Sequence, residues 1–144
     1  MRWMTPRRRN LRLPVIVAAL ACMAHGGEGC GHDDAKTAST LGPLTQAVCP
    51  PQQTLTYANF GRSFLTTYCL RCHSSSVQGA ARMSAPSDHN FDTLIEIRGL
   101  AMHIDQKAGS GPVATNTSMP TIDPRPTLEA RKKLSEWLAC GAPE

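Results

Sequence analysis

Cys69-Leu70-Arg71-Cys72-His73 lies near the middle of the chain and has the pattern Cys-x-x-Cys-His. With the Cys and His content of this chain, the pattern would arise in about 1% of shuffled sequences. Two cysteines three residues apart on a helical turn can reach both vinyl groups along one edge of a porphyrin, and the next residue then lies under the iron. The motif therefore predicts one covalently bound haem c, attached through Cys69 and Cys72, with His73 as the proximal ligand.

Two other roles for such a motif find less support in the sequence. A structural zinc site needs a second Cys or His pair at short spacing, but Cys49 and Cys140 each stand alone. A thioredoxin-like redox pair follows a strand in a βαβ unit, whereas the residues before Cys69 have a helical pattern. A third alternative is a module held by a metal or a disulfide that binds no haem.

The sequence around the motif predicts an all-α fold with three or more short helices. Tyr57, Phe60, Phe64 and Tyr68 recur at steps of three to four residues, which indicates a helix directly before the motif. A weaker helix is expected over 91–104, with Asp92 at its start and Gly99 within it. A last helix is expected over 128–140, with Thr127 as its cap.

Side chains on these helices also carry expectations. Gly61 would allow another helix to approach closely. Trp137 is expected in the core, against the first helix or the haem edge. Arg131, Lys132 and Lys133 are expected to form a solvated face.

The chain is short of large side chains for a core. It has 144 residues, of which 5% are aromatic. Residues 74–90 and 105–126 are rich in Ser, Gly, Pro and Ala and are expected to be loops. Short helices and such loops would pack poorly without a large apolar ligand, and a haem would supply that surface.

Cys49 and Cys140 flank the predicted domain, one before its first helix and one at the end of its last. In an oxidising compartment they are expected to form a disulfide.

The second axial ligand is expected downstream of His73. Met119, followed by Pro120, lies in an irregular segment 46 residues after His73, from which a loop can reach around the haem. Pro120 stiffens the chain beside it. Met119 is the favoured ligand, and an open iron site is the alternative, as are the other downstream candidates Met83, His89, Met102 and His103.

From residue 57 to residue 140 the chain resembles small monohaem class I c-type cytochromes. The matching parts are Gly61 eight residues before Cys69, the motif itself, Met119-Pro120, and the last helix with Trp137. The resemblance implies a cytochrome c-like fold in which the first and last helices cross at the glycine.

The same resemblance implies roles for individual residues. Cys69 and Cys72 would form the thioether bonds, and His73 and Met119 would be the axial ligands. In the family a proline carbonyl after the motif holds the histidine ring, and Ser84-Ala85-Pro86 makes Pro86 the expected counterpart here. The chain also resembles exported cytochrome-like lipoproteins of bacteria.

The first 30 residues are predicted to be an export signal. Five arginines precede an apolar run of twelve residues, 13–24, which is shorter than the ~20 residues that span a bilayer. Cys22 and Cys30 are both candidates for lipidation. Residues 31–48 are expected to be a flexible linker, and residues 49–144 the cytochrome domain.

The net charge of +4 arises in the predicted signal, because residues 31–144 hold ten Lys or Arg and ten Asp or Glu. The predicted mature chain therefore lacks the excess of positive charge that nucleic-acid binding needs. The expected contact with a membrane is a lipid at the N-terminal end.

Together these features predict an exported, periplasmic, monomeric one-electron carrier that is not an enzyme and that exchanges electrons with redox partner proteins. The alternative function is a haem sensor of gas or peroxide, or an enzyme-associated cytochrome module, with an open axial site.

Overall fold

Helices and their connecting loops make up residues 41–144, the part of the chain that the computed structural model describes, and no strand occurs among them. The predicted all-α class is therefore confirmed. The predicted signal, with Cys22 and Cys30, lies outside the described residues. The elements in chain order are a π-helical turn η1 (Tyr57–Gly61), α1 (Arg62–Tyr68), a 3-10 turn η2 (Gly79–Arg82), α2 (Leu94–Gly99), α3 (Ala101–Ala108) and α4 (Leu128–Ala139).

The helix before the attachment motif spans η1 and α1, and its start is fixed by a capping box. Thr56 Oγ1 accepts from Asn59 N at 3.1 Å, and Asn59 Oδ1 accepts from Thr56 N at 2.7 Å. These bonds satisfy amide groups that would otherwise lack partners in the first turn. The predicted stripe of aromatic residues lies on this helical segment and packs against the hydrophobic core.

The weak helix expected over 91–104 is in fact two helices, α2 and α3, that meet at Leu100, which has φ −111° and ψ 12°. The residue that caps α2 is Thr93, whose Oγ1 accepts from Glu96 N, and not Asp92. Asp92 instead accepts hydrogen bonds from Ser74 Oγ and Ser75 N, both at 2.7 Å. It thereby ties the start of α2 to the residues that follow His73.

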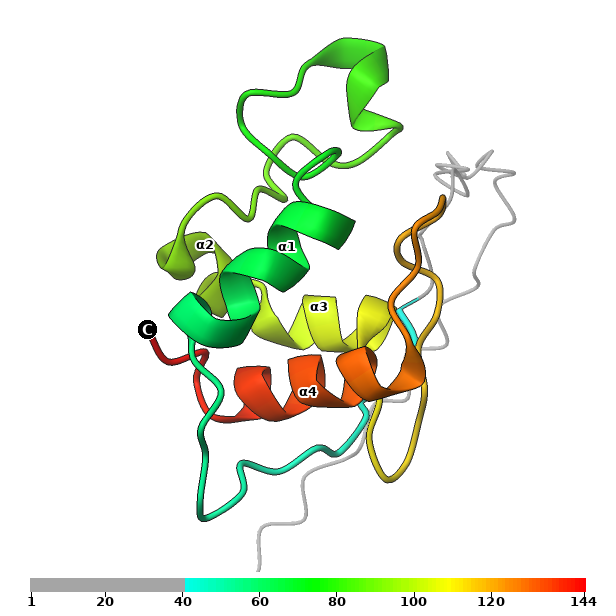
Figure 1. Ribbon diagram of the computed structural model, residues 1–144. Helices are drawn as coiled ribbons and strands as arrows, with labels where there is room; N and C mark the ends of the chain where they lie inside the picture. Colours follow the sequence, from blue (N-terminus) through cyan, green and yellow to red (C-terminus); the bar gives the residue numbers. More distant parts are fainter. Residues whose placement is uncertain (1–40) are drawn as a thin grey trace, which may run out of the picture. The chain divides into compact units, whose positions relative to one another are not determined.

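The first helical segment and α4 meet at Gly61, as predicted. A Cβ atom on Gly61 would lie 2.7 Å from Trp137 Cζ2, so a larger residue has no room there. Trp137 is fully buried and contacts the rings of both Tyr57 and Phe60, at centroid distances of 6.5 and 6.2 Å. Figure 1 shows α1, α3 and α4 gathered around this core, while segment 74–90 projects beyond them.

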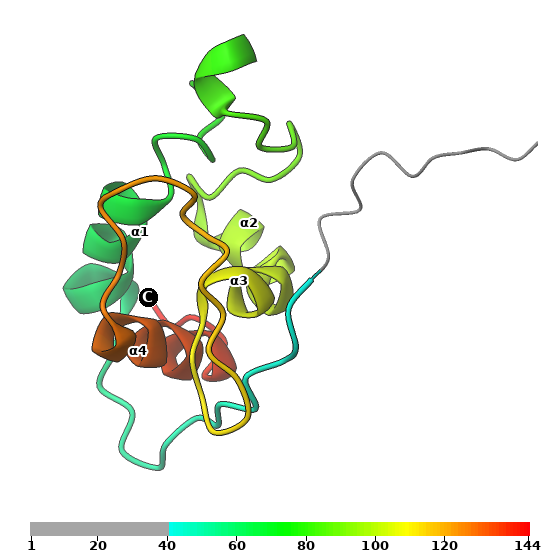
Figure 2. The same ribbon diagram turned by 90° about the vertical axis from the view of Figure 1, so that its right-hand side faces the viewer.

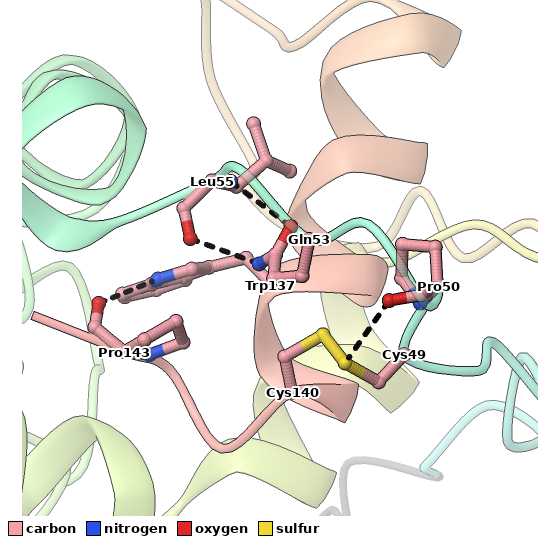
Figure 3. Close-up of a disulfide and its surroundings, with 7 residues drawn as sticks. All are labelled: Cys49, Pro50, Gln53, Leu55, Trp137, Cys140 and Pro143. Atoms are coloured by element: carbon pink, nitrogen blue, oxygen red, sulfur yellow. Dashed lines mark hydrogen bonds between the residues drawn. A yellow bond between two sulfur atoms is a disulfide. The ribbon is translucent and has the colours of Figure 1, made fainter.

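The predicted disulfide is present and joins Cys49 to Cys140, with a Cα–Cα distance of 4.7 Å. It fastens the segment before η1 to the end of α4 (Figure 3). Beside it, Trp137 Nε1 donates to Pro143 O at 3.1 Å, which holds the residues that follow α4 against the core.

The expectation of a flexible linker over 31–48 is wrong for its last residues. Thr45 is 1% exposed, and its N and Oγ1 both donate to the Asp105 carboxylate, at 3.0 and 2.8 Å. Gly42 N donates to Gln106 O at 3.2 Å. Residues 42–45 are thus bound to α3, because Asp105 and the end of that helix offer acceptors that composition alone does not reveal.

None of the helices within residues 41–144 combines the length and the apolar character that crossing a membrane requires.

Candidate haem-binding site

A cavity of about 670 Å³ opens between the end of α1, segment 69–91, α3 and segment 119–126. Its volume falls in the range of sites that enclose small molecules and cofactors, about 300–1,000 Å³. Apolar side chains from all four regions line it: Phe64, Tyr68, Phe91, Ile104, Ala108 and Pro126. Cys69, Cys72, His73 and Met119 line the same cavity, so the structure brings together the four main predicted site residues.

The two motif cysteines follow directly after α1. Cys69 N donates to Leu65 O at 2.8 Å, so the helical turn continues into the motif, and His73 N then donates to Cys69 O at 2.9 Å. Both cysteines are free thiols that face the cavity. Burial raises the pKa of Cys69 to about 12. A redox-active cysteine pair depends on a lowered thiol pKa, so this environment disfavours the thioredoxin-like alternative.

The His73 ring is fixed by two contacts. Its Nδ1 lies 2.9 Å from the backbone oxygen of His89, and its ring stacks on Phe91 with a centroid distance of 4.6 Å and an interplanar angle of 15°. A carbonyl oxygen only accepts hydrogen bonds, so the neutral ring carries its proton on Nδ1. Burial also lowers the pKa of His73 and favours this neutral form. The lone pair of Nε2 is therefore available to a metal.

The structure corrects the role expected of Pro86. The carbonyl that holds the His73 ring belongs to His89, whereas Pro86 O accepts from Arg82 Nη2 at 2.6 Å. Pro86 does line the cavity, but in this loop its carbonyl is used by an arginine and not by the histidine.

Arg82 is a residue that the sequence analysis missed. It is 7% exposed and donates to Ser74 O at 2.7 Å and to Asn90 Oδ1 at 3.0 Å, in addition to Pro86 O. Segment 74–90 has few apolar side chains to bury, so a central cation that binds its carbonyls organises it. In the sequence, this role could have been inferred only from the position of Arg82 as the one arginine in a segment rich in Gly, Ala and Ser.

Met119 is half-buried at the cavity, and its backbone is bonded on both sides. Met119 N donates to Lys107 O at 2.9 Å, and Met119 O accepts from Arg131 Nη1 at 2.9 Å. Among the alternative ligands, Met83, His89 and His103 also line the cavity, whereas Met102 is 65% exposed and lines a smaller pocket elsewhere.

The prediction that Arg131 belongs to a solvated face is wrong. Lys132 and Lys133 are exposed, but Arg131 is 3% exposed. It lies one helical turn before Leu134, so it shares the buried side of α4. A cation there needs partners, and three backbone carbonyls supply them at 2.9 Å each.

The charge of the cavity wall provides a test of the expected cofactor. The described residues that line the cavity include Arg71, Arg82 and Lys107, but no Asp or Glu. In addition, Arg71 Nε is buried and has no hydrogen-bond partner among residues 41–144. A haem is a flat, apolar group that carries two carboxylates. The wall therefore suits it in both polarity and charge.

The zinc alternative finds no support in the part of the chain that the structure describes. Within residues 41–144 no group of three or more His, Cys, Asp or Glu side chains is placed to hold a metal ion. Cys49 and Cys140, which could have completed such a site, are bonded to each other.

Comparison of the chain with protein-family models, with curated proteins and with solved structures finds no match.

Proposed function

We propose that the protein is an exported monohaem c-type cytochrome with a cytochrome c-like fold that carries one electron between redox partner proteins. One observation carries this proposal: Cys69, Cys72, a His73 ring oriented by a backbone carbonyl, and Met119 all line one apolar cavity. The thiols would attach haem c, and His73 Nε2 and Met119 Sδ would be the axial ligands.

The residues of this chain would bind and orient the haem and exclude water from it. The bound haem iron would supply the one-electron chemistry. The His89 carbonyl keeps the proton of His73 on Nδ1 and so keeps Nε2 free for the iron. Phe91 stacks on the His73 ring and restrains its rotation. If His73 and Met119 both bound the iron, they would leave no open position for a substrate, which favours a carrier over an enzyme.

The disulfide supports the export part of the proposal. Cys49 and Cys140 are bonded to each other, and such bonds persist in oxidising compartments such as the bacterial periplasm. Covalent attachment of haem c takes place in the same compartment.

A single preparation tests the proposed function. The full chain is expressed in a bacterium that matures c-type cytochromes, and absorption spectra are recorded before and after addition of dithionite. We expect a six-coordinate, low-spin haem that stays on the chain in acid acetone. The double variant C69S/C72S is the matched control and should release its pigment.

A colourless mature protein, or a wild-type pigment that acid acetone extracts, would refute the proposal. A five-coordinate ferric spectrum with the haem still attached would point instead to the sensor or enzyme-associated module with an open axial site.

A further inference from the structure

The backbone around Met119 is held by an arginine on α4. Arg131 Nη1 donates to Ala108 O, Asn116 O and Met119 O, each at 2.9 Å. These carbonyls belong to the end of α3, to the loop that follows it and to Met119 itself. One buried guanidinium therefore joins three separate points of the path that leads to Met119.

A second arginine holds the residues just after Met119 and comes from a different part of the chain. Arg71, within the attachment motif, donates through Nη2 to Ile122 O at 2.6 Å and through Nη1 to Asp123 O at 2.5 Å. The motif is thereby joined to a segment some 50 residues later in the chain. Figure 2 shows that segment, in orange, arching between α3 and α4.

Hydrophobic packing holds the Met119 end of this arch against the core, but it contributes little over residues 121–125. Thr117, Ser118 and residues 121–125 are exposed, and Met119 and Pro120 are partly buried. Hydrogen bonds from charged donors are stronger than those between neutral groups. The two arginines, together with the bonds from Met119 N and Ser118 Oγ to Lys107 O, are therefore polar restraints on the position of Met119 that add to its packing against the core.

We propose that Arg71 and Arg131 are positioning residues that keep Met119 at the cavity and so resist its replacement by an external ligand. The inference rests on the proposed function, because it assigns the residues that hold the distal ligand of that site. Arg71 is the better residue to change: Arg131 is almost fully buried, and its removal would leave three carbonyls without a donor.

The test uses the mature holoprotein and imidazole, a small haem ligand that must displace Met119 to bind. We expect Arg71→Met to tighten imidazole binding by about tenfold, since it removes two charge-assisted bonds. Arg125→Met is the matched control. Arg125 lies in the same segment, but it bonds within that segment, to Thr121 O at 3.0 Å, and should leave the affinity unchanged.

Hydrogen exchange provides a second readout that a general loss of stability would not reproduce. In Arg71→Met, the amide of Met119, which donates to Lys107 O, should exchange faster, while the amides of α4 should keep the rates of the wild type. Uniform acceleration in both regions would instead indicate that Arg71 contributes only to global stability, and would overturn the inference.

The two proposals fail in different ways. Lack of covalent haem in the wild type refutes the proposed function before any variant is made. If the wild type, Arg71→Met and Arg125→Met all carry attached haem and bind imidazole with equal affinity, the positioning role alone is refuted. If Arg71→Met does not accumulate haem, Arg71→Lys takes its place, because it keeps the charge but loses the planar pair of donors. An affinity of Arg71→Lys equal to that of the wild type then overturns the inference.

Discussion

At the scale of single residues, the His73 side of the cavity is built from backbone oxygens and one buried cation. His89 O fixes the histidine ring, and Arg82 binds the carbonyls of the loop that carries His89. The second proposed ligand depends on a single side chain, that of Met119. The two sides should therefore respond differently to substitution.

Met119→His should lower the reduction potential by an amount on the order of 0.1 V, since axial ligands set haem potentials over a range of about 0.8 V and a His/Met pair favours the reduced iron. Redox titration of the holoprotein measures this shift. Met102→His is the control, because Met102 is exposed and lies away from the cavity. Equal potentials in the wild type and Met119→His would show that Met119 is not an iron ligand.

Asp92 should contribute to acid stability. The hydrogen bond from Ser75 N, followed by that from Ser74 Oγ, lowers the pKa of the Asp92 carboxyl from 3.8. A carboxyl with a lowered folded-state pKa stabilises the protein at any pH above its unfolded-state pKa. This contribution is lost as the pH falls through the folded-state pKa. The wild type should thus lose more stability than Asp92→Asn on acidification below about pH 4.

Unfolding curves in denaturant between pH 5 and pH 2 measure this difference, with Asp123→Asn as an exposed control. Parallel pH profiles for the wild type and Asp92→Asn would contradict the role assigned to the carboxylate.

At the scale of elements, the contact between η1 and α4 is set by the absence of a side chain at Gly61. Gly61→Ala would bring a methyl group to 2.7 Å from Trp137 Cζ2. We expect this variant to lose about 1–3 kcal/mol of unfolding free energy, as overpacked cores do. Calorimetry or denaturant unfolding measures the loss.

Gly99→Ala is the matched control for this contact. Gly99 ends α2, and no atom lies within 4 Å of the position its Cβ would take. This variant should be neutral or gain up to about 1 kcal/mol, because alanine restricts the unfolded chain. If both variants are equally stable, the close approach of Trp137 is not what requires glycine at position 61.

Sequence patterns predicted these elements where local chemistry decides them. Thr127 and the apolar spacing that follows it gave the start of α4 correctly, and the aromatic stripe gave the first helix. The start of α2 was assigned to Asp92, although Thr93 and Glu96 carry a capping-box pattern that could have been found.

Other features depend on distant partners and could not be derived from local patterns. Arg131 is buried because carbonyls from α3 and the following loop converge on it, and Thr45 is buried because Asp105 accepts its donors. The four main site residues were predicted because the Cys-x-x-Cys-His motif and a downstream Met-Pro pair mark them. The acceptor for the His73 ring depends on the path of segment 74–90, which the sequence does not specify.

At the scale of the whole molecule, the disulfide closes a long loop that contains the attachment motif. Cys49 and Cys140 are 91 residues apart. In the chain-entropy model such a bond stabilises the folded state by about 4.6 kcal/mol. The double variant C49S/C140S of the holoprotein should lose stability of that order in denaturant unfolding.

Chemical reduction of the wild type is the control for this variant, since thioether bonds to haem survive reducing agents while the disulfide does not. The reduced wild type and the double variant should unfold alike. An unchanged midpoint in both would show that the disulfide adds no stability.

Arg131 binds main-chain oxygens, and this has a consequence for which side chains residue 119 can carry. The guanidinium binds the carbonyl of residue 119 whatever side chain that residue carries. Exchanging the side chain therefore leaves the anchoring of the loop intact. Under the proposed function, this position could therefore accept a different donor atom, and the reduction potential could change through one substitution while the surrounding loop stays in place.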